Sequence, residues 1–305
     1  MLVSAEAAAP VRISTAARFS PAWLAERLQG YVLHIAVIGL TVAWMVPAIG
    51  LLVSSFRPFS ALNSTGWWTA LSPPFQFTLD NYAQVLQQSG LGHSLFNSFM
   101  ISIPATIIPV TVAAFAAYAF SWMKFPGRNW IFLALVGLLA VPLQLSFVPV
   151  LKAYNSIGLT PNNWGFVGVW LAHTGYGLPF SIYLLANFFR ALPSDLFESA
   201  EIDGAGTLTV FFRIVLPLSV PALASLIIFQ FLWIWNDLLV ALIYVGGTEA
   251  VAPMTVTLAN LTNSLGQGYN LLTAAAFLSM IVPLIVFLSL QRYFVRGILA
   301  GSVKG

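Results

Sequence analysis

Residues 28–56 read LQGYVLHIAVIGLTVAWMVPAIGLLVSSF, a stretch without Lys, Arg, Asp or Glu that is bounded by Arg27 and Arg57. A helix needs about 20 predominantly apolar residues to cross the hydrocarbon core of a bilayer. A strand of a transmembrane barrel would instead alternate apolar and polar residues over about 10 positions. This stretch is apolar on every face, so it predicts a membrane-spanning α-helix, which we place at residues 31–53.

Five further charge-free stretches follow along the chain, and each is long enough for one span. Only 7% of the residues are charged and 59% are hydrophobic, whereas soluble domains carry about 25% charged residues. Residues 58–79, between Arg57 and Asp80, are too polar and too rich in Pro and Gly for a span and are expected to form a loop. The sequence predicts an all-α polytopic membrane protein with spans at about 31–53, 97–120, 130–151, 166–189, 216–240 and 271–294.

The basic residues predict the orientation of these spans. Ten of the 12 Lys and Arg residues fall on one side, and only Arg57 and Lys152 fall on the other. Because short cytoplasmic loops carry the excess of basic residues, residues 1–30 and 295–305 are both expected in the cytoplasm. The net charge of +3 is divided among short membrane-flanking loops, which favours contact with lipid and not with nucleic acid. The ten residues are Arg12, Arg18, Arg27, Lys124, Arg128, Arg190, Arg213, Arg292, Arg296 and Lys304.

The cytoplasmic loop between the fourth and fifth spans, residues 191–217, is the most polar part of the chain and contains four of its nine acidic residues. Pro193 is expected to end the preceding helix, and Ser194 is a suitable N-cap for a short new helix. Gly204 and Gly206 would end that helix. Helix physics alone leaves open that this is an ordinary solvated amphipathic loop.

The spacing of this loop resembles a known motif. The loop contains Glu198-Ser199-Ala200, then three residues, Gly204, nine residues and Ile214-Val215-Leu216-Pro217. This spacing is similar to the "EAA" loop of ATP-binding-cassette (ABC) importer permeases, except that Ser199 stands where the family pattern has an Ala. Three other segments resemble the carbohydrate branch of that family, the maltose-type, MalG-like permeases. They are Leu192-Pro193, Trp235-Asn236-Asp237 and the ending 291–305.

The resemblance implies a function and a set of partners. The loop would form a coupling helix that docks in a cleft of a cytoplasmic ATPase, with Glu198 as the charged contact and with Ala200 and Gly204 allowing close approach. The partners would be two ABC ATPases, a second homologous permease in a heterodimer, and an extracytoplasmic sugar-binding protein, which the external loop 246–270 would face. The expected location is the cytoplasmic (inner) membrane of a bacterium or archaeon. The implied ATPase-coupling residues are Glu198, Ser199, Ala200, Asp203, Gly204, Ile214, Leu216 and Pro217, and the tail residues that reach the ATPase are Gly301, Ser302 and Lys304.

The chain carries no signature of an enzyme. A phosphate-binding P-loop places its Lys between Gly and Ser or Thr, and none of Lys124, Lys152 and Lys304 has those neighbours. ATP and Mg²⁺ are therefore expected on the partner ATPases, with no cofactor or metal in this chain. Cys is absent, and the isolated His34 and His173 are expected near the membrane interfaces.

Two other functions remain open from the residues alone. One is an ABC importer for a solute that is not a sugar, and the other is an ion-coupled secondary carrier. A carrier usually places ionisable groups at mid-membrane, and only Asp237 comes near this description. Trp233, Trp235, Asn236 and Asp237 are candidates to line a substrate pathway, although aromatic residues in membrane helices also serve as packing residues.

Overall fold

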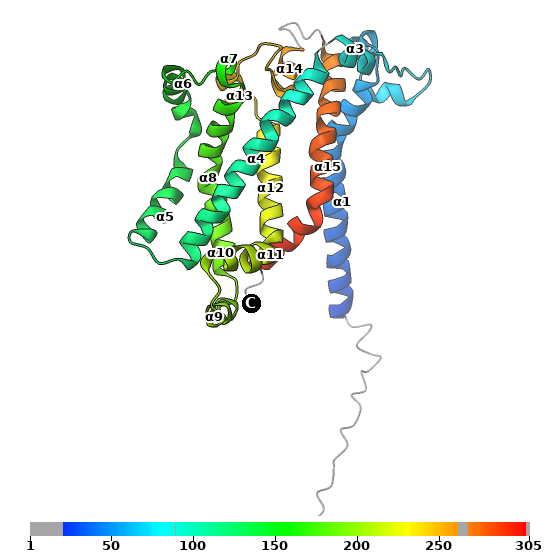
Figure 1. The fold of residues 1–305 in the computed structure, drawn as a ribbon. Coiled ribbons are helices and arrows are strands. Elements are labelled where there is room, and N and C mark those ends of the chain that lie inside the picture. Colours follow the sequence, from blue (N-terminus) through cyan, green and yellow to red (C-terminus); the bar gives the residue numbers. More distant parts are fainter. Residues whose placement is uncertain (1–20, 89, 262–267, 303–305) are drawn as a thin grey trace, which may run out of the picture.

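The computed structural model describes residues 21–88, 90–261 and 268–302, and side chains are described from residue 28 to residue 292. Within these ranges the chain is helical and contains no strand. The long helices run beside one another, and short helices lie at both ends (Figure 1). The elements are α1 (Pro21–Ser55), α2 (Phe59–Ser64), η2 (Trp67–Leu71), α3 (Asp80–Gln88), α4 (Leu91–Trp122), α5 (Arg128–Gly137), η3 (Leu138–Ala140), η4 (Leu143–Ser146), α6 (Phe147–Ser156), α7 (Pro161–Trp164), α8 (Val167–Arg190), α9 (Ser194–Ile202), α10 (Thr207–Val210), the π-helical η5 (Phe211–Val215), α11 (Leu216–Leu218), α12 (Val220–Trp235), α13 (Leu239–Tyr244), α14 (Met254–Asn260) and α15 (Tyr269–Ser302).

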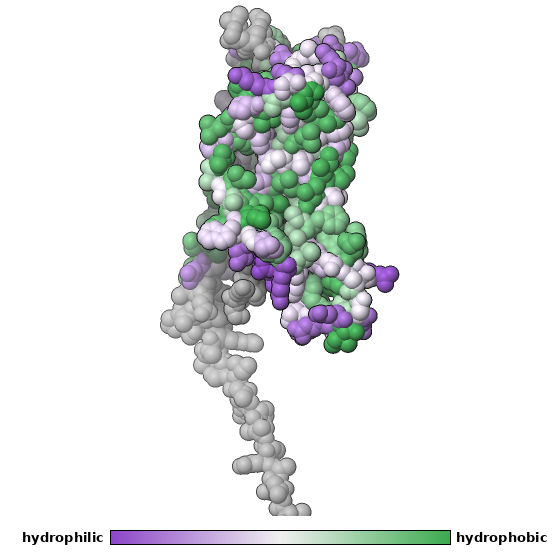
Figure 2. Space-filling view, turned by 60° about the vertical axis from the view of Figure 1, so that its left-hand side comes forward, coloured by the Kyte–Doolittle hydropathy of each residue, from purple (hydrophilic) through white to green (hydrophobic). Residues whose placement is uncertain are grey.

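The surface of the molecule is that of a membrane protein. Hydrophobic residues cover much of the middle of the face seen in Figure 2, and hydrophilic residues gather at its two ends. Large apolar side chains along α1 are exposed, among them Ile35, Leu40 and Trp44. Soluble monomers rarely expose contiguous apolar surface on this scale. The all-helical membrane fold predicted from the sequence is confirmed.

Among the described residues, three helices are long and apolar enough to cross a membrane: Leu28–Ser55, Leu91–Trp122 and Tyr269–Arg292. The number rises to at most five if two bent helix pairs each count as one span. Helix α8 is not among them, although it has 24 residues, because residues such as His173, Thr174 and Asn187 lower its hydropathy. It is packed along α4 and also contacts α12.

The segment predicted as a single span at 130–151 is broken in the structure. Arg128–Ala140 and Leu143–Ser156 meet at an angle of 96°, and Pro142 lies at the break as the residue that precedes η4. Proline lacks the N–H that would continue the helical hydrogen bonds, and its ring collides with the preceding turn. A second bend of 75° separates Thr207–Leu218 from Val220–Trp235, so that α10, η5 and α11 lie across the end of the bundle before α12 enters it (Figure 1).

The region expected to be a loop between Arg57 and Asp80 contains α2 and η2 and is organised around a buried cation. Arg57 is fully buried and donates hydrogen bonds to the carbonyls of Ala61 and Thr65, both at 3.1 Å. Its own carbonyl accepts a 2.8 Å bond from Asn81 on α3. Asn270 on α15 donates to the Asn81 side chain at 2.7 Å, so this network joins the ends of α1 and α15.

Part of the segment 246–270, which the sequence predicts to be external, is held against α4. Asn97 donates to the carbonyl of Ala252 at 3.1 Å, and the Ser98 hydroxyl accepts a 2.8 Å bond from the backbone N–H of Met254. These bonds fix the start of α14 on the bundle. Residues 262–267 of the same segment lie outside the described residues.

Helices α8 and α12 are joined inside the bundle by a buried amide. Gln230 on α12 is 3% exposed. Its Nε2 atom donates to the Ser181 hydroxyl at 2.7 Å and to the Gly177 carbonyl at 3.2 Å. A Cβ atom on Gly177 would lie only 2.4 Å from that Nε2 atom, so the amide fits here because residue 177 has no side chain.

We expect Gly177→Ala to destabilise the bundle, because the methyl group would displace the Gln230 amide and leave buried polar groups unpaired, at a cost of about 1–3 kcal/mol. Gly175→Ala is the matched control on the same helix, since no atom lies within 4 Å of the position that its Cβ would take. Thermal unfolding of the detergent-purified variants measures the difference. Equal midpoints for the two variants would contradict this role of Gly177.

Candidate functional site

The loop between α8 and α12 places α9 outside the bundle, at the end that we call the α9 end (Figure 1). Helix α8 ends at Arg190, and Pro193, with φ −60° and ψ 129°, turns the chain into α9. The expectation that Ser194 caps α9 is wrong. Ser194 is the first helical residue and makes no capping bond to the backbone, because Pro193 takes the extended conformation that precedes a helix.

The inner face of α9 is attached firmly to the bundle. The ring of Phe197 stacks on that of Trp122 at the end of α4, with centroids 3.5 Å apart and planes 15° from parallel. The Trp122 indole N–H donates to the carbonyl of Phe189 on α8 at 2.9 Å. Ala200 is only 7% exposed and belongs to the same apolar core as Phe189 and Phe211. A displacement of α9 would therefore be passed directly to the ends of α4 and α8.

The outer face of α9 combines negative charge with exposed apolar side chains. Leu196 is 39% exposed and Ile202 is 87% exposed. Glu198 is also exposed on this helix. Within the described residues, none of the acidic side chains of α9 forms an ion pair. This face has the composition of a surface that another protein covers. The exposed acidic residues are Asp195, Glu198, Glu201 and Asp203.

Gly204 ends α9 in a conformation that suits glycine. Its φ of +71° lies in the left-handed region, where a side chain is strained. The N–H of Ala205 bonds to the carbonyl of Ala200 at 2.9 Å, and that of Gly204 bonds to Glu201 at 3.0 Å, a pattern that closes helices with glycine after the last turn. No atom lies within 4 Å of the position of a Cβ on Gly204, so the space beside it is open.

The remaining predicted coupling residues divide into two groups. Ser199 is exposed, and its hydroxyl bonds back to the carbonyl of Asp195 at 2.8 Å. Ile214 and Leu216 pack against the core that also holds Ala200, whereas Pro217 is exposed. Ala200 thus lies on the inside of α9, so its small size sets how closely α9 packs on its own chain.

The predicted tail contacts lie at the limit of the described structure. Helix α15 continues to Ser302, so Gly301 and Ser302 extend the last long helix. The predicted tail residue Lys304 lies outside the described residues.

The candidate pathway residues lie at the far end of α12 but do not share one surface. Trp235 is 3% exposed and donates from its indole to the carbonyl of Ser279 on α15 at 3.2 Å. Trp233 is half-buried, and Asn236 is exposed with its amide bonded to the carbonyl of Leu232 at 2.7 Å. Asp237 accepts a 2.9 Å bond from the N–H of Ala241 and so caps α13. Trp235 is a packing residue in this conformation.

His173, which was predicted near a membrane interface, is fully buried inside the bundle. Its Nε2 atom lies 3.9 Å from Oδ2 of Asp237, and its ring meets that of Trp233 edge-on at 5.2 Å. Sequence reasoning missed this pair because 64 residues separate its members; polarity in the middle of an apolar span was the available signal.

Comparison with known proteins identifies the relatives of this arrangement. The profile of the family described as "Binding-protein-dependent transport system inner membrane component" matches residues 94–300. The osmoprotective compounds uptake permease protein GgtD of Synechocystis sp. is 56% identical over 92% of this chain and 94% of its own length. The alpha-glucoside transport system permease protein AglG of Rhizobium meliloti is 51% identical over 83% of this chain and 67% of its own.

The fold itself recurs in a solved structure. A chain from the crystal structure of a bacterial ABC transporter involved in the import of the acidic polysaccharide alginate superposes with a TM-score of 0.73. The superposition covers 90% of this chain and 99% of that one, at 20% sequence identity. The arrangement of helices around α9 therefore belongs to a known transporter architecture.

Proposed function

Because this chain belongs to the family of binding-protein-dependent transport system inner membrane components, we propose that it is the permease subunit of an ABC importer in which α9 couples a partner ATPase to the membrane helices. One observation carries the proposal. The segment with the EAA spacing folds into a helix whose inner face is fixed to α4 and α8 and whose outer face is acidic and uncovered.

The proposed membrane topology has six spans with both termini in the cytoplasm. The three long helices and the two bent pairs supply five of these spans, and α8 would be the sixth, shielded from lipid by its neighbours. The excess of basic residues at the α9 end supports a cytoplasmic position for that end. Residues 191–217 then face the compartment that holds ATP, and α2, α3 and α14 lie outside.

The proposed assembly contains three further kinds of component. Two ABC ATPases would bind ATP and Mg²⁺ and contact α9 and the tail residues Gly301, Ser302 and Lys304. A second, homologous permease would complete the pathway as a heterodimer, and an extracytoplasmic binding protein would deliver the solute. The family description, which names binding-protein-dependent transport and the inner membrane, supports this assembly in the cytoplasmic membrane of a bacterium or archaeon.

We propose a sugar, in particular an alpha-glucoside, as the transported solute. The support is the named function of AglG, an alpha-glucoside permease that is 51% identical to this chain. A second candidate is an osmoprotective compound, because GgtD, at 56% identity, is named as an uptake permease for such compounds. The two candidates agree if the osmoprotectant itself carries a glucose unit.

The geometry also supports a mechanism of coupling. Protein interiors are close-packed and transmit displacement with little compression. Closure of the ATPases on ATP would move α9, and the core around Phe189, Ala200 and Phe211 would carry this movement into α4, α8 and α12. The 75° bend before α12 lets α10 and α11 follow α9 as one unit. The pathway would then open alternately to the two sides.

Copurification tests this proposal directly. We expect the tagged chain, extracted from its native membrane in mild detergent, to retain a P-loop ATPase and a second permease, and the ligand of the associated binding protein to identify the solute. Uptake in reconstituted vesicles should require ATP. A chain that purifies alone and moves solute down an ion gradient without ATP would contradict the proposal and favour a secondary carrier.

A further inference from the structure

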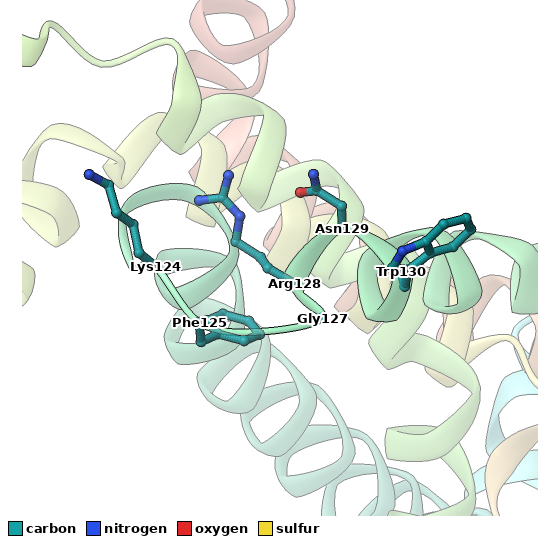
Figure 3. Close-up of a pocket in the computed structure, with 6 residues that line it drawn as sticks. All are labelled: Lys124, Phe125, Gly127, Arg128, Asn129 and Trp130. Atoms are coloured by element: carbon teal, nitrogen blue, oxygen red, sulfur yellow. The ribbon is translucent and has the colours of Figure 1, made fainter.

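Two neighbouring pockets form one groove at the α9 end, beside the turn between α4 and α5. The first has a volume of about 330 Å³ and includes Lys124, Arg128 and Trp130 in its lining (Figure 3). The second has a volume of about 480 Å³ and runs between α5 and α8 toward Tyr183 and Arg190. Arg128 and Asn129 line both pockets, so the two are adjacent, and we treat them as one groove.

The outer part of this groove is basic and lacks compensating charge. In the described chain no carboxylate pairs with Lys124, Arg128 or Arg190. Arg128 donates one hydrogen bond, to the carbonyl of Met123 at 3.1 Å, which leaves most of its N–H groups free. The Arg190 guanidinium lies 4.4 Å from the centroid of the Phe132 ring, so it is fixed over the groove. Figure 3 shows the side chains of Lys124, Arg128 and Asn129 pointing to the same side.

The inner part of the groove is apolar and faces the membrane-embedded half of α5. It is lined by Phe132, Leu133, Val136 and Tyr183. Leu133 is 60% exposed, and beside the groove Trp130 is 77% exposed. Exposed tryptophan is typical of the membrane–water interface. In the membrane topology proposed above, the charged part of the groove lies at the headgroup level, and the apolar part extends into the hydrocarbon.

We propose that this groove binds one anionic phospholipid, whose phosphate is held by Lys124, Arg128 and Arg190 and whose acyl chain lies along Leu133 and Val136. Basic pockets between membrane helices are suited to such headgroups, and Arg binds phosphate through two parallel hydrogen bonds. A free phosphate ion would use only the basic part of the groove. A phospholipid uses both parts, and it also brings the negative charge that three neighbouring cations lack.

The binding experiment uses the full chain in detergent with its copurified partners, after delipidation. Native mass spectrometry measures the retention of dioleoyl-phosphatidylglycerol, with dioleoyl-phosphatidylcholine as the zwitterionic comparison. Each basic residue near a membrane surface strengthens the binding of anionic lipid by roughly five-fold. We therefore expect Arg128→Gln/Arg190→Gln to weaken phosphatidylglycerol binding by about 25-fold and to leave phosphatidylcholine binding unchanged.

Two matched variants make the result specific. Arg213→Gln removes one positive charge, as each of the two groove substitutions does, from an exposed residue at the α9 end that lines neither pocket, and it should bind phosphatidylglycerol as the wild type does. Leu133→Trp keeps every cation but fills the apolar part, and it should weaken phosphatidylglycerol binding without affecting the binding of inorganic phosphate. If the double Arg variant fails to fold, the Leu133→Trp variant alone tests the proposal.

Four outcomes would overturn the proposal. Equal retention in the wild type and in both groove variants would mean that the lipid binds elsewhere. An Arg213→Gln effect as large as that of the double variant would mean unspecific attraction by net charge. Displacement of phosphatidylglycerol by millimolar inorganic phosphate, or its loss whenever the partner ATPases are bound, would assign the groove to a soluble anion or to a protein contact.

Discussion

Replacing Glu198 by Lys is expected to reduce uptake by roughly 100-fold while the protein reaches the membrane at its normal level. The carboxylate is exposed on the outer face of α9 and makes no ion pair in the described chain, so its reversal leaves the fold intact. In the assembled importer the same change would place a cation against the basic partner that the EAA resemblance implies. The loss of one member of a desolvated charge pair costs about 2–5 kcal/mol, which is enough to release the ATPase.

The measurements are the amount of ATPase that copurifies with the variant and the rate of solute uptake. Glu201→Lys is the matched control, because Glu201 carries the same charge on the same helix, is exposed and lies outside the motif. We expect it to cost less than three-fold in uptake. Normal transport by the Glu198→Lys protein, or equal losses in both variants, would show that the outer face of α9 does not carry a specific contact.

Replacing Arg57 by Met is expected to lower the stability of the end of the bundle opposite α9 by about 3 kcal/mol. The guanidinium is fully buried and donates hydrogen bonds to the carbonyls of Ala61 and Thr65. Without it the Thr65 carbonyl loses its side-chain donor, and the Ala61 carbonyl keeps only the bonds from nearby residues of its own segment. Hydrogen bonds from a charged donor contribute about 1.5–3 kcal/mol each. The end of α1 would lose these bonds to α2, whereas the Asn81 bond to the backbone carbonyl of residue 57 would remain.

Thermal unfolding in detergent and limited proteolysis of residues 58–79 measure this effect. Lys152→Met removes the other basic residue expected outside, and it is the control because Lys152 is exposed. Arg57→Lys should fall between the wild type and Arg57→Met, since an ammonium group cannot reach both carbonyls at once. An Arg57→Met protein as stable and as protease-resistant as the wild type would contradict the structural role of this cation.

The distribution of charges was sufficient to predict the helical membrane fold, because excluding charged groups from the hydrocarbon is the strongest constraint on such a chain. The break at Pro142 could not be predicted with the same certainty. Proline is tolerated inside long helices, as Pro104 and Pro109 are in α4, so the residue alone does not decide between a mild kink and a sharp bend. Packing against neighbouring helices decides it.

The candidate site also contains some features that the sequence predicts and others that it does not. The spacing from Glu198 to Pro217 was visible in the sequence because the motif is local, and the end of α9 at Gly204 followed from glycine chemistry. The stacking of Phe197 on Trp122 joins residues 75 positions apart, and the sequence contains no signal for that pairing. For His173 and Asp237 the sequence signals two polar residues within apolar stretches, but not that they lie side by side. Contacts of this kind depend on how α4, α8 and α12 pack, which no local pattern specifies.

The modest hydropathy of α8 has a consequence for how the protein is made. A segment with His173, Thr174 and Asn187 partitions into lipid less readily than the three helices that qualify as spans. Helix α4, its main packing partner, is synthesised earlier and offers Ser121 and Trp122 as hydrogen-bond donors to α8 carbonyls. Insertion of α8 during translation would then require that α4 still lies beside the translocon when α8 emerges. A mutation that makes α4 less stable in the membrane would leave α9 on the wrong side of the membrane. Quality-control proteases would then degrade the chain before it assembled with its partners.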